Sequence, residues 1–136
     1  MKYFLDTNIC IYFLKGTHSS VKNLLMEKHP DDIRICSIVR AELLYGAEKS
    51  AKQKENLRIV EGFLLPFSIV PFGEKESTAY AKIRARLEKT GSPIGPNDLL
   101  IAATVQAHEG CLVSNNLHEF SRIEGLRIEN WVANSG

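Results

Sequence analysis

The stretch YFLDTN, residues 3–8, decides the fold of this chain. Its three apolar residues predict a short buried strand that stops at Asp6, and residues 8–14 predict a mostly buried helix. The same order recurs along the chain, and acids stand near the start of two later helical patterns, at Glu42 and Asp98. Strands that alternate with helices predict an α/β protein, a three-layer sandwich around a mostly parallel sheet.

The other elements are predicted from the spacing of apolar residues. Strands are predicted at residues 3–5, 33–37, 67–70, 111–113 and 126–128. Helices are predicted at residues 8–14, 20–28, 53–64, 74–89 and 96–108, with a further one starting at residue 38. The longest, at residues 74–89, is amphipathic and turns Ile83 and Leu87 inward.

Composition indicates an ordinary globular protein. The 136 residues predict a single domain, residues 1–136, that is long enough to bury a core. The chain is 44% hydrophobic and 24% charged, and 17 basic against 16 acidic residues give a net charge of +1. The overall charge does not indicate a nucleic-acid-binding protein, so any basic surface must be local.

The cysteines and the apolar segments indicate the compartment. Cys10, Cys36 and Cys111 match no zinc or disulfide spacing, which predicts buried thiols in a reducing environment. The first apolar run is interrupted at Asp6, too early for a signal peptide, and no apolar run has membrane-spanning length. We therefore expect a cytoplasmic protein with no membrane contact.

Acids and amides follow several of the predicted strands. Asp6, Glu42, Asp98, Asn116 and Glu119 fall where the carboxyl ends of parallel strands would bring them to one edge of the sheet. Clustered carboxylates repel one another unless a cation joins them. Carboxylate and amide oxygens, without clustered His or Cys, favour Mg²⁺ or Mn²⁺ over zinc. A metal-assisted cleavage of phosphodiesters is the function that this set predicts.

Each of these residues also has a simpler interpretation. Asp6 suits a helix cap, Glu42 a solvated helix position, and Asp98 the favourable end of a helix dipole. Asn116 suits a turn and Glu119 an exposed surface. Only the joint placement of all five at one predicted edge favours the functional interpretation.

Basic residues offer candidates for RNA phosphate contacts. Arg40 lies close to Glu42 in sequence, and Lys82 and Arg86 belong to the outer stripe of the helix at residues 74–89. The alternative for the stripe is a solvated helix face. The histidines are expected to be solvated surface residues, and His118 is in addition a candidate for lining the predicted cleft.

Four ordered blocks resemble the PIN-domain ribonucleases, and among them the VapC toxins of bacterial type II toxin–antitoxin pairs. The resemblance extends from Lys2 to about Trp131. The blocks are LDTNI at residues 5–9, AELLYGA at 41–47, GPNDLLIAA at 95–103, and LVSNNLHEF at 112–120 with Asn130-Trp131.

The resemblance implies a PIN fold with a central five-stranded parallel sheet. It implies Mg²⁺- or Mn²⁺-dependent endoribonuclease activity on tRNA or ribosomal RNA, which stops translation. Asp6, Glu42 and Asp98 carry over as the metal-binding acids, and Thr7 as a hydroxyl that orients Asp6. Many PIN domains have a fourth acid where this chain has Asn116.

Glu119 is close enough in sequence to compensate for that missing acid. Two further positions depart from the pattern: Val39 stands where a hydroxyl residue is common, and Thr104 where close relatives often have His.

The resemblance also implies partners, namely a second copy of the chain and a VapB-type antitoxin whose C-terminal segment lies across the helices of residues 38–64. Leu44, Tyr45, Phe63 and Leu64 are either core residues or contacts for that partner. Two other functions stay open. One is a catalytically weak PIN-like module that acts through antitoxin and operator complexes, and the other is a metal-dependent nuclease that acts on DNA.

Overall fold

Five short parallel strands form the centre of the computed structural model, which describes residues 1–133. They are β1 (Tyr3–Leu5), β2 (Ile33–Cys36), β3 (Ser68–Val70), β4 (Cys111–Val113) and β5 (Arg127–Glu129). Their order is β3-β2-β1-β4-β5, and every neighbouring pair is parallel. The predicted α/β sandwich is confirmed, with a sheet that is wholly rather than mostly parallel within the described residues. The expected domain, residues 1–136, includes positions 134–136, which lie outside the described residues.

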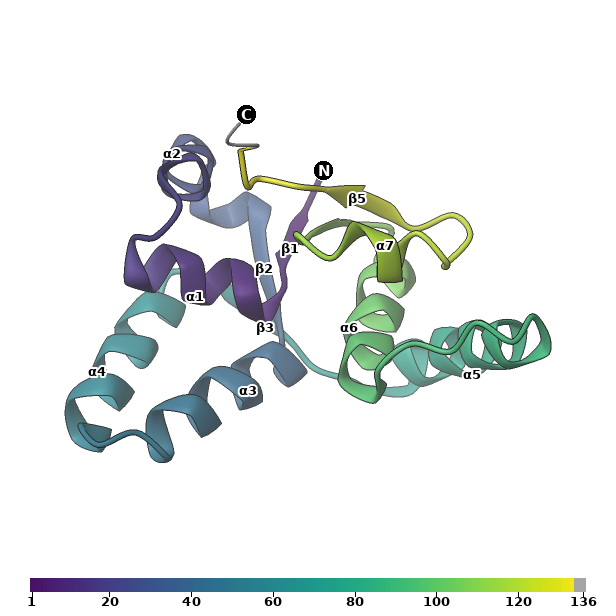
Figure 1. Ribbon diagram of the computed structural model, residues 1–136, viewed down its shortest axis with the longest axis horizontal. Coiled ribbons are helices and arrows are strands. Elements are labelled where there is room, and N and C mark those ends of the chain that lie inside the picture. Colours follow the sequence, from purple (N-terminus) through teal and green to yellow (C-terminus); the bar gives the residue numbers. More distant parts are fainter. Residues whose placement is uncertain (134–136) are drawn as a thin grey trace.

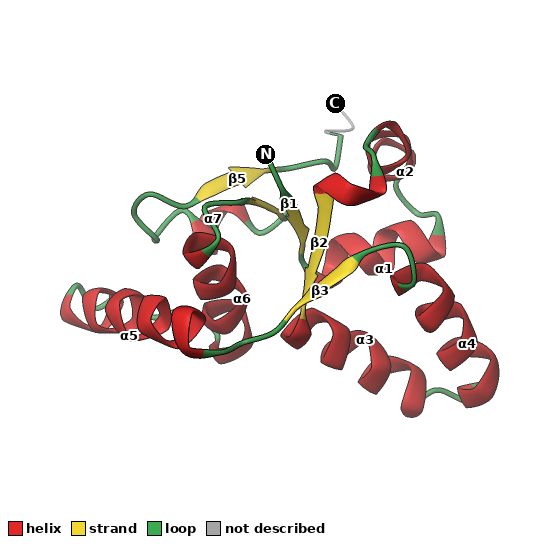
Figure 2. Ribbon diagram, turned by 180° about the vertical axis from the view of Figure 1, so that it is seen from behind, coloured by secondary structure: helices red, strands yellow, loops and turns green. Residues whose placement is uncertain are grey.

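Helices cover both faces of the sheet (Figures 1 and 2). One layer contains α1 (Thr7–Lys15), α2 (Ser19–Glu27), α3 (Ser37–Glu48) and α4 (Gln53–Leu64). The other contains α5 (Glu74–Lys89), α6 (Pro96–Ala107) and the short α7 (Leu117–Phe120). A 3-10 turn, η1 (Pro30–Asp32), leads into β2. Among the residues described, no helix has the length and apolar character needed to cross a membrane.

The chain turns sharply from β1 into α1 at Asp6. This residue has extended backbone angles, and its side chain accepts a hydrogen bond from the Ile9 amide at 2.9 Å, which caps the helix. Gly16 ends α1 with a positive φ of 66°, a conformation that glycine adopts without a steric penalty. The cap holds the Asp6 carboxyl at the carboxyl end of the central strand.

The core lies between the sheet and the two helical layers. Phe4, Ile35 and Leu112 from three strands are almost fully buried, and Val39 and Ile101 pack there from α3 and α6. The three thiols, Cys10, Cys36 and Cys111, are also buried and free, as the sequence predicts. This core fixes the strands whose carboxyl ends carry the acids.

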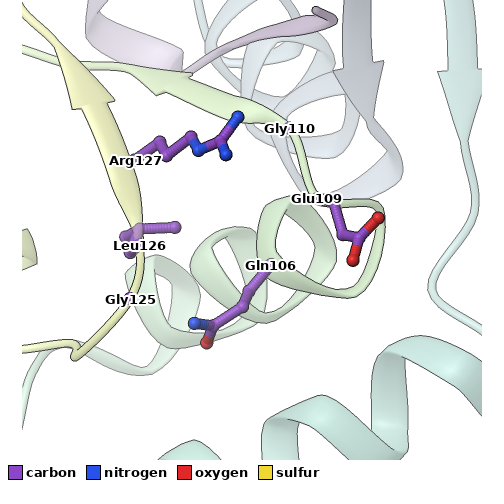
Figure 3. A pocket seen from close by; sticks show the side chains of 6 residues that line it. All are labelled: Gln106, Glu109, Gly110, Gly125, Leu126 and Arg127. Carbon is purple, nitrogen blue, oxygen red and sulfur yellow. The ribbon is translucent and has the colours of Figure 1, made fainter.

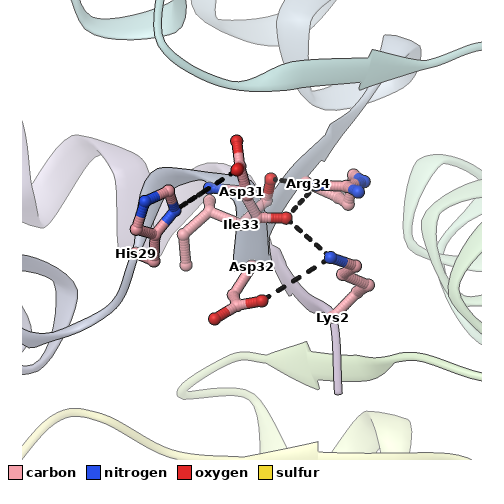
Figure 4. Close-up of polar contacts among 6 residues, drawn as sticks. All are labelled: Lys2, His29, Asp31, Asp32, Ile33 and Arg34. Atoms are coloured by element: carbon pink, nitrogen blue, oxygen red, sulfur yellow. Dashed lines mark hydrogen bonds and ion pairs between the residues drawn. The ribbon is translucent and has the colours of Figure 1, made fainter.

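A polar cluster ties β1 to η1 and β2 where the two strands begin (Figure 4). The Lys2 ammonium donates to the Asp31 carbonyl at 2.9 Å and lies 3.5 Å from the Asp32 carboxylate. The Arg34 guanidinium donates to the same Asp31 carbonyl at 2.5 Å. These exposed contacts fix the strand starts, and an ion pair of this kind contributes little to stability.

The structure corrects several predicted boundaries. The first and third helices begin one residue early, at Thr7 and Ser37, and the last strand is shifted by one residue to Arg127–Glu129. Helix α7 (Leu117–Phe120) was not predicted. A helix of this length contains one turn, which is too short to show a repeating apolar pattern.

Candidate active site

Asp6 is the most buried acid at the carboxyl edge of the sheet, with 6% of its surface exposed. Burial raises the pKa of its carboxyl, hydrogen bonds from Ser114 and the Ile9 amide lower it, and the charge of Glu42 raises it. The capping interpretation of Asp6 is therefore confirmed, and the same carboxyl also lies within electrostatic reach of a second acid.

Glu42 lies in the second turn of α3 and is held by two other helices. The Thr7 hydroxyl, from the first turn of α1, donates to its Oε1 at 2.5 Å. The Asn97 amide, from the first turn of α6, lies 3.4 Å from its Oε2. The structure thus gives Thr7 a different partner from the expected Asp6. Figure 1 shows the first turns of α1, α3 and α6 gathered around the end of β1.

Asp98 lies in the first turn of α6, where the charges of the other acids at this edge act on its carboxyl group. Burial raises the pKa of its carboxyl to about 7, and the nearby carboxylates of Glu119, Asp6 and Glu42 add to the rise. The contact with Glu119 includes a hydrogen bond between the two carboxyl groups, which requires a proton on one of them. Four acids from distant parts of the chain therefore share one region.

Glu119 is oriented by donors on both of its oxygens. The Gly95 amide donates to Oε1 at 2.7 Å, and the Asn116 side-chain amide donates to Oε2 at 2.8 Å. Burial raises the pKa of Glu119, but these two bonds, the one to Asp98 and the charge of Arg122 outweigh it, so that the pKa is lowered. Asn116 thus orients Glu119, which is a fourth carboxylate in the region and lies beside the position where the family pattern has an acid.

The donor set is made of oxygen atoms and suits Mg²⁺ or Mn²⁺. Within residues 1–133, however, no group of three His, Cys, Asp or Glu side chains is arranged to hold a metal ion as it stands. Both oxygens of Glu42 and of Glu119 instead accept hydrogen bonds from protein donors. A cation would replace some of these donors and the proton between Asp98 and Glu119.

Known proteins match nearly the whole chain. Residues 3–126 match the PIN domain family. Ribonuclease VapC2 of Rickettsia felis is 44% identical over 132 residues, 96% of this chain and 98% of that protein. The tRNA(fMet)-specific endonuclease VapC of Shigella flexneri is 37% identical over 131 residues, with 96% and 98% covered. The chain belongs to the VapC ribonucleases of the PIN domain family.

Solved VapC structures share this fold. The crystal structure of VapBC2 from Rickettsia felis bound to a DNA fragment from their promoter matches with a TM-score of 0.87 and 42% identity, covering 96% of this chain and 99% of that chain. DNA-bound VapBC from Salmonella typhimurium matches with a TM-score of 0.87 and 38% identity, covering 96% and 98%. The expected PIN fold is confirmed.

The basic candidates lie at different distances from the acids of this VapC chain. Arg40 is exposed near the start of α3, two positions before Glu42. Lys82 and Arg86 line a shallow groove with residues near the C-terminal end of α6, whereas Asp98 lies at its N-terminal end. The structure therefore does not bring this basic stripe to the acids, and Arg86 instead pairs with Glu124 at 3.5 Å.

The positions that depart from the family pattern are core residues. Val39 is fully buried in α3. Thr104 is also fully buried, and its hydroxyl donates to the Leu100 carbonyl at 2.9 Å, one turn earlier in α6. Neither side chain takes part in the hydrogen bonds that hold Glu42 and Glu119.

Sequence reasoning missed three residues of this site. Asn97 contacts Glu42. Ser114 is fully buried beside Asp6, and its hydroxyl accepts a hydrogen bond from the backbone amide of Asn116 at 2.9 Å. Arg122 lies beside His118 and Glu119. The sequence does hold a signal for the first two, because each is a polar residue adjacent to a predicted strand end or helix start.

The cavity in Figure 3 has a volume of about 470 Å³ and lies away from the acids. It opens between the C-terminal end of α6 and the start of β5, where Gln106, Glu109 and Arg127 surround it (Figure 3). Both elements meet there at the end opposite to Asp98 and to the carboxyl edge of the sheet. It is therefore not part of the candidate active site.

A mainly apolar groove of about 340 Å³ reaches the acids from the other side. Three helices, α1, α3 and α4, form it, and Glu42 is one of its lining residues. The apolar side chains that line it are Ile11, Leu14, Leu43, Ala47, Ile59 and Val60. Among the four apolar residues considered for a partner, Leu64 is core, Leu44 and Phe63 are half-buried, and Tyr45 is exposed.

Proposed function

We propose that this VapC chain is a Mg²⁺- or Mn²⁺-dependent endoribonuclease that cleaves structured RNA and thereby stops translation. The observation that carries the proposal is the meeting of four carboxyl groups from separate elements, Asp6, Glu42, Asp98 and Glu119, at one edge of the sheet. In this cluster burial raises the pKa of Asp98 to about 7, and the charges of the other three acids add to the rise. Such repulsion costs stability and is relieved when a divalent cation binds among the acids.

Asp6, Glu42, Asp98 and Glu119 are the residues that would hold the cation. A bound cation would acidify a water molecule and offset the charge that develops on the attacked phosphate. The chain itself supplies orientation: Thr7 and Asn97 hold Glu42, while Gly95 and Asn116 hold Glu119. These donors set the direction in which each carboxylate faces the shared region.

Transfer RNA is the proposed first substrate. The Shigella flexneri relative, with 37% identity over nearly the whole chain, is named a tRNA(fMet)-specific endonuclease. Initiator tRNA therefore comes first among the RNAs to test, and ribosomal RNA second. Arg40 is the best placed of the three basic candidates for a phosphate contact, because it is exposed on the same helix as Glu42.

A VapB-type antitoxin and a second copy of the chain are the proposed partners. Two solved VapBC structures cover 95% or more of this chain at above 35% identity. The apolar groove between α1, α3 and α4 is the surface proposed for the antitoxin, because a segment bound there would pass directly beside Glu42. Binding at that place would block access of RNA to the acids.

Both of those solved VapBC structures contain DNA. This favours a second role, as part of a DNA-bound complex with the antitoxin. Such a role does not need the acids, so it persists when Asp98 is replaced by Asn.

The test is cleavage of purified initiator tRNA, total tRNA and ribosomal RNA by the antitoxin-free protein, with Mg²⁺ or Mn²⁺ and with EDTA. We expect discrete fragments with either metal, none with EDTA, and none from Asp98→Asn. A single-stranded and a double-stranded DNA of matched length test the nuclease on DNA. Fragments from Asp98→Asn equal to those from the wild type would contradict the proposal.

A further inference from the structure

Asp98 and Glu119 come from different elements, α6 and α7, and one loop lies between them. This loop, residues 91–95, precedes α6, and its Gly95 amide donates to Glu119 Oε1 at 2.7 Å. A Cβ placed on Gly95 would lie 3.6 Å from Glu119 Oε1 and 3.8 Å from Asp98 Oδ2, so both carboxyl groups face this one backbone position. The position of the loop therefore decides how the two acids face each other.

Arg122 holds the same loop at a second point. Its Nη1 donates to the Pro93 carbonyl at 2.8 Å, and its backbone amide donates to the Glu119 carbonyl at 3.3 Å. Glu119 and Arg122 thus contact the loop at Gly95 and at Pro93. The loop is therefore attached at two points to the segment of residues 119–122.

The guanidinium of Arg122 is not engaged in an ion pair among residues 1–133. Its side-chain contacts are the Pro93 carbonyl and the His118 ring, whose Nε2 lies 3.5 Å from Nη2. By contrast, Arg84 and Arg86 pair with Glu88 and Glu124. The positive charge of Arg122 therefore lies near Glu119 without an ion-pair contact, while its guanidinium hydrogen-bonds to the loop.

On its inner side the loop is held by Ile94, which packs against the core, and by the Ser92 amide, which donates to the Leu87 carbonyl at 2.9 Å; its outer side is exposed. Phe120 and Ile123 bury the inner side of this segment, but Glu119 and Arg122 lie on its solvent side. Within the loop, Gly91, Pro93 and Gly95 are exposed, and Gly91 has a positive φ of 70°. Exposed loops with few buried contacts open at low free-energy cost, so a side-chain anchor matters at this position.

The structure assigns Arg122 as a positioning residue of the nuclease site, an inference that rests on the proposed function. Its guanidinium holds Pro93, and through the loop it keeps the Gly95 amide on Glu119 and Glu119 beside Asp98. Replacing it should loosen the acid pair without removing any group that would bind a cation.

The first test measures hydrogen exchange of the Gly95 amide by NMR in metal-free protein. In Arg122→Ala we expect exchange about tenfold faster, the change that loss of one ordinary hydrogen bond brings. Arg122→Lys keeps a donor for the Pro93 carbonyl and should retain most of the protection. The matched control is Arg127→Ala, which removes the same charge from an exposed arginine near the cavity of Figure 3.

The second test measures Mn²⁺ binding by electron paramagnetic resonance of free Mn²⁺, together with the kinetics of tRNA cleavage. In Arg122→Ala we expect Mn²⁺ affinity and kcat to fall by about fivefold, a change of about 1 kcal/mol, while KM for tRNA stays within twofold. A raised KM with unchanged Mn²⁺ affinity and unchanged Gly95 exchange would instead identify Arg122 as an RNA contact and overturn the inference.

The two tests separate this inference from the proposed function. If the wild type binds Mn²⁺ and cleaves tRNA, but Arg122→Ala exchanges Gly95 at the wild-type rate, only the role of Arg122 is overturned. If the wild type and Asp98→Asn bind Mn²⁺ equally weakly and cleave nothing, the proposed nuclease is overturned, and the role of Arg122 with it.

Discussion

The Thr7 hydroxyl donates a hydrogen bond to the Glu42 carboxylate at 2.5 Å, although 35 positions separate the two residues. The bond joins the first turn of α1 to the second turn of α3 beside the Asp6 cap. Hydrogen bonds to charged groups contribute about 1.5–3 kcal/mol. The Thr7 side chain therefore fixes Glu42 with respect to Asp6, through its contact with Glu42 and not with Asp6.

Thr7→Val should lower kcat for RNA cleavage by about tenfold or more, because the bond that orients Glu42 is lost while the shape is kept. Thr7→Ser keeps a hydroxyl and should retain most of the activity. The measurement is single-turnover cleavage of initiator tRNA at saturating Mg²⁺. Equal rates for Thr7→Val and the wild type would show that Glu42 needs no orientation by this bond.

The raised pKa of Asp98, about 7 against an ordinary 3.8, predicts a pH-dependent stability in the absence of metal. The folded protein binds this proton more tightly than the unfolded chain does. The free energy of unfolding should therefore lose a contribution as pH rises from about 4 to about 7. Asp98→Asn removes this loss, so in EDTA the variant should gain stability over the wild type at pH 8 but not at pH 4.

The expected gain at pH 8 is roughly 1 kcal/mol after solvent screening of this half-buried group, or about 3 °C in Tm. Thermal melts of both proteins at pH 4, 6 and 8 in EDTA measure it. Addition of Mg²⁺ at pH 8 should then raise Tm of the wild type more than that of Asp98→Asn. A difference in Tm between the two proteins that is constant across this pH range would count against the acid cluster.

The sequence was sufficient to place the three main acids at one edge, because Asp6 and Glu42 follow strand patterns, Asp98 begins a helical pattern after a loop, and the strands of such a sheet run in parallel. Which hydroxyl or amide meets which acid could not be predicted in this way. Thr7 stands next to Asp6 in sequence, yet it bonds to Glu42, since the packing of α1 against α3 decides the contact. Side-chain partners across helices depend on that packing.

The basic stripe lies away from the acids for a similar reason. Lys82 and Arg86 lie on an exposed face of α5, as the helical period predicts, but that face lines a groove with Gln106 and Ala107, at the end of α6 opposite to Asp98. Periodicity gives the face of a helix and not its position along its neighbour. Arg122 was missed because it directly follows α7, which is too short to show a repeating apolar pattern in the sequence.

Asn116 and Glu119 should differ in their effects on activity. Glu119→Gln removes a carboxylate from the shared region and should lower RNA cleavage by at least about a hundredfold, of the order expected when a principal stabilising charge is lost. Asn116→Asp removes the amide that donates to Glu119 and places a second negative charge there, so cleavage should also fall.

Asn116→Ser is the informative control, because it keeps a hydroxyl donor without adding charge. We expect Asn116→Ser to retain more activity than Asn116→Asp in the same tRNA assay. If Asn116→Asp is instead more active than the wild type, the chain uses position 116 as a direct ligand, and Asn116 does not act through Glu119.

The apolar groove predicts which surface mutations release the antitoxin. Ile59 lines the groove and is 48% exposed, so Ile59→Glu should fold while it weakens antitoxin binding by about tenfold or more, as expected for an apolar contact residue. Leu65→Glu is the control, since Leu65 is 85% exposed and is not a lining residue of the groove. Titration calorimetry with the antitoxin measures both, and equal affinities would place the antitoxin elsewhere.

Glu76 offers a stability prediction separate from the acids. It is 6% exposed, and its two oxygens are both engaged, Oε1 by the Gly73 amide at 2.8 Å and Oε2 by His108 Nε2 at 2.5 Å. The pair clamps the start of α5 to the end of α6, far along α6 from Asp98. Glu76→Ala should therefore lower the stability by about 2 kcal/mol, because two hydrogen bonds to a buried carboxylate are lost.

For a chain of this size that loss corresponds to a fall in Tm of about 6 °C. The neighbouring Glu74→Ala, at an exposed position, should shift Tm by far less. Since α6 remains folded at 25 °C, Glu76→Ala should still cleave tRNA at close to the wild-type rate. A variant that melts like the wild type would show that the clamp contributes nothing. A Glu76→Ala variant that melts like the wild type but no longer cleaves tRNA would instead show that this end of α6 influences Asp98.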